Sequence, residues 1–218
     1  MSKSTKPRSA TSYKRSFTSY KETAFGILPR SKIIGLEAEG VKKAQDHIIK
    51  LSNQKTPITP QVILDIHKEG FGFIFPDWAG KFRIIDVTVG DYEPPHYSKV
   101  PELIVNLCDD LTERIKHLPS TDNDEKFLSE FISLLAWFQH RFVWTHPFND
   151  YNGRVGRLLT NLILLNLGFP ILTIKVEVEK DREDYVNAMK SADNHDFLEL
   201  ENLIAQALKE GLESLKQD

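Results

Sequence analysis

Four side chains suited to phosphate chemistry lie within one twelve-residue segment of the chain, residues 146–157. They are His146, Asp150, Arg154 and Arg157. A histidine titrates near neutral pH and can act as a general base, a carboxylate can hold Mg²⁺ together with phosphate oxygens, and an arginine can grip phosphate with two parallel hydrogen bonds. The set therefore predicts attack on a phosphorus atom, a reaction that depends on positioning and charge stabilisation.

The backbone of the same segment is also suited to anions. Asn152-Gly153 lies where a helix is expected to begin, and the first N–H groups of a helix have no partner within it. Arg154 and Arg157 are three residues apart on the first turn, so both side chains face the same region. A phosphate group is the ligand that this arrangement favours.

Each of these residues also has an ordinary explanation. A single histidine at a helix end is usually a surface or capping residue, and Asn-Gly is a common turn. A metal hydrolase built on His140, His146 and Asp150 is disfavoured, because residues six apart on a helix do not share a face. Their concentration in one short segment favours a phosphate site over unrelated roles.

The segment lies between the two most apolar helices that the sequence predicts. Apolar residues at three- and four-residue spacing, with Pro and Gly at the expected ends, define the helices. A run of β-forming residues between Lys81 and Tyr97, punctuated by Gly and Pro, predicts a short strand or hairpin. The fold class is thus mainly α with one small β element. The expected helices span about residues 31–51, 60–70, 100–116, 125–144, 154–167, 182–192 and 196–216.

Charge divides the chain of 218 residues into a short basic part and an acidic remainder. The net charge is −3, but residues 1–34 carry eight basic residues and one acidic residue. We therefore expect a basic, flexible tail over residues 1–30 and a single domain over residues 31–218. The acidic domain argues against nucleic-acid binding.

The composition fits a globular protein of a reducing compartment. The chain is 40% hydrophobic and 27% charged, and no apolar run reaches the length of a membrane span. Cys108 is the only cysteine, so no internal disulfide can form. The basic start lacks the apolar segment of a secretory signal. We expect a cytoplasmic protein with no membrane partner, although secretion by another route, as an effector, stays open.

The segment HPFNDYNGRVGR resembles the signature of the Fic (filamentation induced by cyclic AMP) family, H-x-F-x-[D/E]-[G/A]-N-[G/K]-R-x-x-R. The resemblance extends over about residues 30–210 and includes GKFRIIDVTVG, which is similar to the start of the family's flap. It implies a helical bundle with a small β-hairpin flap at about residues 81–97 and an active-site loop at residues 146–157.

The resemblance also implies an activity. Fic proteins typically transfer AMP from ATP to a hydroxyl side chain of a target protein, so a Mg²⁺-dependent protein adenylyltransferase (an AMPylating nucleotidyltransferase) is implied. His146 would deprotonate a Ser, Thr or Tyr hydroxyl, Phe148 would anchor the loop, and Asp150 would bind Mg²⁺. The target would add an extended segment to the flap. Modification of its own chain and a homodimer are left open.

The remaining residues of the motif would bind the nucleotide. By the resemblance, Asn152 and the backbone at Gly153 would cradle phosphate. Arg154 would neutralise the leaving pyrophosphate, and Arg157 would contact the β- or γ-phosphate. Tyr185 is similar to a family tyrosine near the adenine, and packing as a helix residue is the alternative.

Position 151 departs from the signature. The family has Gly or Ala there, whereas this chain has Tyr151. A bulky ring in a phosphate nest would crowd the ligand. Two alternatives to AMP transfer follow: another donor, such as phosphocholine or a different nucleotide, or an inactive Fic-fold binding module.

Many Fic proteins also carry an inhibitory helix with the pattern [S/T]-x-x-x-E-[G/N]. Here the predicted helix at about residues 31–51 contains Glu39-Gly40, with Gly35 where Ser or Thr is expected. The resemblance implies that Glu39 pairs with Arg157 and keeps the enzyme inactive. The alternative is a solvated glutamate on the helix surface.

Overall fold

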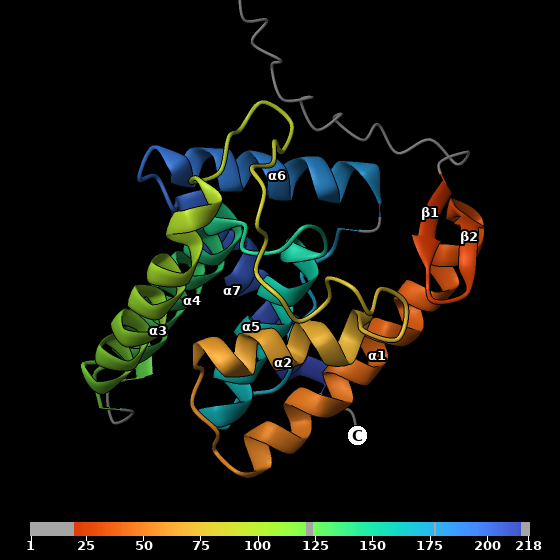
Figure 1. The fold of residues 1–218 in the computed structure, drawn as a ribbon. Coiled ribbons are helices and arrows are strands. Elements are labelled where there is room, and N and C mark those ends of the chain that lie inside the picture. Colours follow the sequence, from red (N-terminus) through yellow and green to blue (C-terminus); the bar gives the residue numbers. More distant parts are fainter. Residues whose placement is uncertain (1–19, 121–123, 177, 215–218) are drawn as a thin grey trace, which may run out of the picture.

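Helices dominate the computed structural model, which describes residues 20–120, 124–176 and 178–214 (Figure 1). This confirms the mainly α class, and each predicted helix is present. None of the helices in these ranges is long and apolar enough to cross a membrane. The helices are α1 (Arg30–Asn53), α2 (Pro60–Phe71), α3 (Val100–Lys116), α4 (Asp124–Thr145), α5 (Asn152–Asn166), α6 (Glu179–Asp193) and α7 (Leu198–Ser214), with a short 3-10 turn η1 (Tyr97–Lys99) before α3.

The β-structure lies in a different place from the one predicted. Strands β1 (Tyr20–Thr23) and β2 (Gly26–Pro29) form an antiparallel hairpin that leads directly into α1. The expected flexible tail over residues 1–30 is therefore wrong for residues 20–29. Residues 1–19 lie outside the described part of the chain.

The segment at residues 81–97, called the flap below, forms less β-structure than its residue types predict. It connects α2 to α3 (Figure 1). It contains a single β-bridge, between Val89 and Tyr92. One backbone bond joins it to the motif loop (residues 146–151), because Arg83 N–H donates to the Pro147 carbonyl at 2.9 Å. The flap is consequently held both by contacts with the motif loop and by side-chain bonds to its own backbone.

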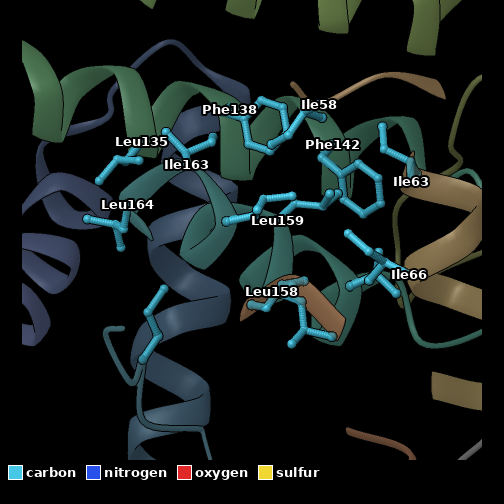
Figure 2. Close-up of a cluster of buried hydrophobic side chains, with 14 of the residues drawn as sticks. Ile58, Ile63, Ile66, Leu135, Phe138, Phe142, Leu158, Leu159, Ile163 and Leu164 are labelled. Atoms are coloured by element: carbon cyan, nitrogen blue, oxygen red, sulfur yellow. The ribbon is translucent and has the colours of Figure 1, made fainter. Parts of the chain in front are cut away.

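The core that supports the motif forms where three helices meet (Figure 2). Helix α4 precedes the motif loop and helix α5 follows it. Their apolar faces pack against each other, and α2 completes the cluster. Both ends of the loop are thus attached to rigid, buried helices. The residues labelled in Figure 2 are Ile58, Ile63, Ile66, Leu135, Phe138, Phe142, Leu158, Leu159, Ile163 and Leu164.

Helix α1 crosses α2 at an unusually close approach made by two glycines. A Cβ atom added to Gly40 would lie 2.0 Å from the carbonyl oxygen of Gly70, so no side chain fits there. The face of α1 that includes Gly40 is buried, with Ile33 and Ala44 also in contact with the core. This crossing places the first half of α1 beside the motif loop, since α1 packs on α5 as well.

Candidate active site

The motif loop joins the last turn of α4 to the first turn of α5 and has two residues in left-handed backbone conformations. His146 has φ 48° and Tyr151 has φ 66°, and neither is glycine. Such conformations are costly for residues with side chains and persist where neighbouring groups enforce them. The loop is therefore a strained segment held by its surroundings, which is common at functional sites.

Two side chains of the loop hold it closed. Asn152 accepts a hydrogen bond from the Phe148 N–H at 2.8 Å and donates to the Phe148 carbonyl at 2.9 Å. Phe148 is fully buried, as expected for a residue that anchors the loop. The amide of Asn152 is thus committed to the loop, and its side chain does not point out to a ligand as the resemblance implied.

His67 of α2 is a site residue that the sequence did not reveal. Its ring stacks on Phe148, with ring centroids 3.8 Å apart, and it is fully buried. Nδ1 accepts a bond from the Gly80 N–H at 2.8 Å, so Nε2 carries the proton and faces the Asp150 carbonyl at 3.3 Å. Burial lowers the pKa of His67 to about 4, although Asp150 acts in the opposite direction. The ring is therefore neutral, and it connects α2 to the Asp150 carbonyl of the motif loop.

His146 is set up as an acceptor of a proton. Its Nδ1 lies 3.3 Å from the Val143 carbonyl, so Nδ1 carries the hydrogen and Nε2 keeps its lone pair. Burial, the largest effect, lowers the pKa of His146 to about 4. The imidazole is therefore neutral at physiological pH, which is the form that a general base requires.

Asp150 has one oxygen turned inward and the other paired with a cation. Oδ1 accepts from the Tyr151 N–H at 2.7 Å, and Oδ2 lies 2.6 Å from Lys21 Nζ on β1. Burial opposes ionisation, but Lys21 and these bonds outweigh it and lower the pKa of the carboxyl.

Asp150 also suits a divalent cation that is bound mainly through a substrate. Its side chain is 46% exposed, and a cation already neutralises it. In the described residues no cluster of three His, Cys, Asp or Glu forms a complete metal site. A single carboxylate fits Mg²⁺ that completes its shell with water and phosphate oxygens.

The N-terminus of α5 presents groups that are suited to an anion. The first helical bond is from Val155 N–H to the Tyr151 carbonyl at 3.0 Å, so the N–H groups of residues 152–154 have no partner within the helix. Arg154 lies on this turn, and its Nη1 atom is buried without a hydrogen-bond partner among the described residues. A buried, unpaired guanidinium nitrogen beside a helix N-terminus is suited to a phosphate oxygen.

The carboxylate that reaches the motif is Glu37, and the expectation for Glu39 is wrong. Glu37 is 1% exposed and accepts bonds from Arg154 Nη2 at 2.9 Å and from Arg30. Glu39 is 54% exposed and pairs with Lys43, one turn further along α1. Burial raises the pKa of Glu37, but the bonds from Arg30, Arg154 and Tyr151 outweigh it, so the pKa is lowered and the carboxylate stays charged.

Helical phase explains why Glu37 and not Glu39 points inward. The buried face of α1 contains Ile33, Glu37, Gly40 and Ala44, at spacings of three and four residues. Two residues further along a helix the side chain has turned by about 200°, so Glu39 faces solvent. The position of Glu37 within this apolar stripe is the sequence signal that identifies it.

The Tyr151 ring packs on α2 and the segment after it, and the Arg154 guanidinium lies over it, 5.2 Å from the ring centroid. Its ring is 7% exposed and stacks on Phe71, with centroids 4.0 Å apart, beside Phe75 and Trp78. Its hydroxyl donates to Glu37 Oε1 at 2.8 Å. The departure from the family pattern therefore connects the motif loop to α1 and α2.

Arg157 of α5 is half-buried and hydrogen-bonds to Tyr185 of α6, while its Nη1 atom lies near Gly153 at the start of α5. The Tyr185 ring is 7% exposed, and its hydroxyl accepts a bond from Gln139 Nε2 at 2.7 Å. Burial raises the pKa of Tyr185, although hydrogen bonds from Gln139 and Arg157 act in the opposite direction. Tyr185 thus contacts Arg157 with its hydroxyl, and the burial of its ring corresponds to the alternative of packing as a helix residue.

A helical bundle that presents a neutral histidine, an unpaired arginine nitrogen and a free helix N-terminus in one loop is a domain suited to act on phosphate groups. Residues 57–164 match the model of the Fic/DOC family, and the chain carries a Fic/DOC domain. The match begins after α1, so the inclusion of all of residues 31–218 in one domain stays a prediction.

Relatives and solved structures agree with this assignment. The chain is 32% identical over 172 residues to a protein named Protein adenylyltransferase Fic from Nematostella vectensis, covering 79% of this chain and 37% of that protein. A Fic-domain-containing signaling protein from Bacteroides thetaiotaomicron has the same fold, with a TM-score of 0.67 and 21% identity over 81% of this chain and 69% of the other.

The effector BepC from Bartonella tribocorum, solved with bound AMPPNP, also shares the fold. Its TM-score is 0.66, with 16% identity over 90% of this chain and 94% of the other. By contrast, the present chain spans little more than a third of the adenylyltransferase from Nematostella vectensis.

Proposed function

We propose that this protein transfers AMP from ATP to a hydroxyl side chain of a protein. The observation that carries the proposal is the grouping of neutral His146, the unpaired Nη1 of Arg154 and the free N–H groups at the start of α5. Support comes from the relative named as an adenylyltransferase and from BepC, whose structure contains AMPPNP. ATP is accordingly the proposed donor substrate.

The chain's residues have distinct tasks in this reaction. Nε2 of His146 accepts the proton of the target hydroxyl as its oxygen forms a bond to the α-phosphorus. The bond from the α-phosphorus to the oxygen shared with the β-phosphate breaks, and pyrophosphate leaves with the electron pair. Arg154 and the N–H groups at residues 152–154 stabilise the phosphate charge during this change. Arg157, on the same face of α5, holds the outer phosphates.

Asp150 is the residue that would hold Mg²⁺. Its Oδ2 atom, now paired with Lys21, is the oxygen available to a cation, whereas Oδ1 is held by the Tyr151 N–H. When bound, Mg²⁺ supplies positive charge that neutralises the triphosphate and its leaving group. Lys21 must move away from Asp150 before a divalent ion binds there.

The structure corresponds to an inhibited state in this proposal. Glu37 occupies Nη2 of Arg154, one of the two terminal nitrogens with which an arginine grips phosphate. Its negative charge also lies beside the anion-binding end of α5 and repels a phosphate group. The regulatory role that was expected for Glu39 is therefore proposed for Glu37.

The flap is the proposed docking site for the target. Ile84 is 79% exposed, and Ile85 and Val89 are more than one-third exposed. Exposed apolar side chains on an extended, unpaired segment suit the addition of a strand from another chain. A segment docked in this way would run next to the loop, because Arg83 of the flap bonds to Pro147.

The test is transfer of label from ATP to protein in four variants. Purified protein is incubated with Mg²⁺ and ATP labelled at the α-phosphate, and labelled protein is measured for wild type, Glu37→Gly, Glu39→Gly and Glu37→Gly combined with His146→Ala. We expect weak labelling of the wild type and about ten- to hundredfold more with Glu37→Gly, the scale of losing one buried charge contact. Glu39→Gly is the matched control and should remain like wild type.

The same assay separates the alternatives. Combining Glu37→Gly with His146→Ala should remove at least a hundredfold of the labelling, the contribution of a general base. Labelling that survives this change would contradict the role of His146. Label from CDP-choline but not from ATP would assign phosphocholine transfer, and AMPPNP binding without any transfer would assign a binding module.

A further inference from the structure

Arg83 is a fully buried arginine, and each of its three guanidinium nitrogens donates to a backbone carbonyl. Nε donates to the His146 carbonyl at 2.8 Å, Nη1 donates to the Ile85 carbonyl at 2.9 Å, and Nη2 donates to the Pro95 carbonyl. Its own N–H donates to the Pro147 carbonyl. One residue therefore joins the outgoing part of the flap, the returning part of the flap and the start of the motif loop.

The chemistry of this contact requires arginine. A guanidinium presents five N–H donors in a rigid plane, so three nitrogens can reach three carbonyls in different directions at once. A lysine ammonium carries its donors on a single atom and cannot span the three segments. The nearest carboxylate, Asp86, is half-exposed and lies 3.5 Å from Nη1, so the carbonyl oxygens are the closer partners of this charge.

The bond to His146 acts on the strained part of the loop. His146 has a φ of 48°, a conformation that is costly for a residue with a side chain. Its carbonyl and the next one, of Pro147, are both held by Arg83. Two successive carbonyls fixed by one buried residue set the direction of the His146 backbone and hence of its imidazole.

We infer that Arg83 is a positioning residue that fixes the distance between the target segment on the flap and the proton acceptor of His146. The inference rests on the proposed function for its consequence in catalysis, but its structural content is independent of it. The carbonyl bonds described for the Arg83 guanidinium run to the flap and to His146, and none of them reaches the groups at the start of α5. Its loss should therefore change transfer and flap order, and leave nucleotide binding intact.

The experiment compares Arg83→Lys, Arg83→Met and Arg141→Met, each combined with Glu37→Gly to remove the inhibitory carboxylate. Arg141 is the matched control, because it also lies near the loop but stacks on Trp144 and makes no contact with the flap carbonyls described above. Three quantities are measured: backbone hydrogen exchange of the flap and of residues 146–151, AMPPNP affinity by calorimetry, and the initial rate of AMP transfer to protein at saturating ATP.

Arg83→Lys and Arg83→Met should speed exchange in the flap by at least tenfold and slow transfer by about ten- to hundredfold, the scale of a small misplacement of reacting groups. AMPPNP affinity should change less than twofold, and Arg141→Met should resemble its parent. Unchanged flap exchange, full transfer by Arg83→Lys, or AMPPNP affinity that falls in parallel with transfer would each overturn the inference.

Folding and function are separated by the same measurements. If both Arg83 variants fail to fold, as judged by circular dichroism and AMPPNP binding, then Arg83 is required for folding and the inference is wrong. If Glu37→Gly itself transfers no AMP, the proposed function fails, and faster exchange confined to the flap and residues 146–151 would still support Arg83 as their anchor.

Discussion

The motif loop is held from two sides, and the two sides use different kinds of contact. On the side of β1 and α1, charged side chains meet the charged groups of the motif, as Glu37 does with Arg154 and Lys21 with Asp150. On the side of α2 and the flap, Arg83 and His67 bind backbone carbonyls of the loop. The first kind of contact occupies groups that the proposed function assigns to the nucleotide and Mg²⁺, whereas the second kind leaves those groups free.

This difference separates inhibition from positioning. An ion pair to a functional side chain can be removed without altering the backbone that presents that side chain. A buried bond to a carbonyl defines where the backbone runs, and its loss moves the whole loop. Changes on the α1 side should therefore raise transfer, and changes on the flap side should lower it.

The largest effect is expected from Gly40→Ala, which forces α1 away from α2. The added Cβ would lie 2.0 Å from the Gly70 carbonyl oxygen, so the helices must separate and Glu37 must move with α1. We expect a loss of about 2 kcal/mol in the free energy of unfolding, the scale of overpacking, and a melting temperature about 4–8 °C lower. Transfer of AMP should nevertheless rise about tenfold or more, measured below the melting transition.

Gly35→Ala is the control on the same helix. A Cβ at Gly35 meets no atom within 4 Å, and alanine favours a helix over glycine by about 1 kcal/mol. This variant should melt slightly higher and transfer AMP at the wild-type rate. If Gly40→Ala instead lost transfer together with stability, α1 would be a support of the loop, and the comparison between the two sides would be broken.

A smaller effect is expected when one tyrosine hydroxyl is removed from each side. Tyr151→Phe keeps the stack on Phe71 and removes one of three donors to Glu37, so transfer should rise about three- to tenfold. Tyr92→Phe removes a bond from the flap to the Trp144 carbonyl at 3.0 Å. This second variant should not raise transfer, and a rise in both would show that the two sides are not distinct. Initial rates with labelled ATP measure both.

Much of this organisation was predictable from the sequence. Apolar periodicity and caps placed the helices, and the spacing of His146, Asp150, Arg154 and Arg157 identified the motif before any geometry was known. The choice of Glu39 failed because it followed the Glu-Gly pair of a motif pattern. The buried stripe of α1 was a better guide, since it contains Glu37.

Other parts required the structure because their signal is not local. His67 and Arg83 lie 83 and 63 residues from the loop residues that they contact, and nothing in their neighbourhood in sequence marks them. The direction of the Tyr151 ring depends on a left-handed backbone and on aromatic residues of α2 and the segment after it. Contacts of this kind follow from tertiary packing, which residue types alone do not determine.

A further test concerns the cation beside Asp150. Lys21→Met removes the ammonium 2.6 Å from Oδ2, so a divalent ion no longer competes with it. A partly exposed ion pair contributes up to about 1 kcal/mol, which corresponds to a gain of about three- to fivefold in Mg²⁺ affinity. Calorimetry of Mg²⁺ binding in the presence of AMPPNP measures it. Lys43→Met, which removes a lysine paired with exposed Glu39, should change nothing. Equal Mg²⁺ affinities of the wild type, Lys21→Met and Lys43→Met would show that Lys21 does not compete with Mg²⁺ for Asp150.

The smallest expected effect is in the pH dependence of the Glu37→Gly variant. Burial lowers the pKa of His146 to about 4, with Arg83 acting in the same direction and the Val143 carbonyl and Asp150 in the opposite one. Lowering a histidine pKa preserves the neutral base in mild acid, so kcat/KM should change less than about twofold between pH 7.5 and 5.5. An imidazole with the ordinary pKa of 6.5 would lose about tenfold over that range. AMPPNP affinity measured at both pH values corrects for titration of the nucleotide. A tenfold loss in kcat/KM alone would show that the loop, once freed from α1, opens His146 to water, so that contacts on the flap side do not suffice to keep the base buried.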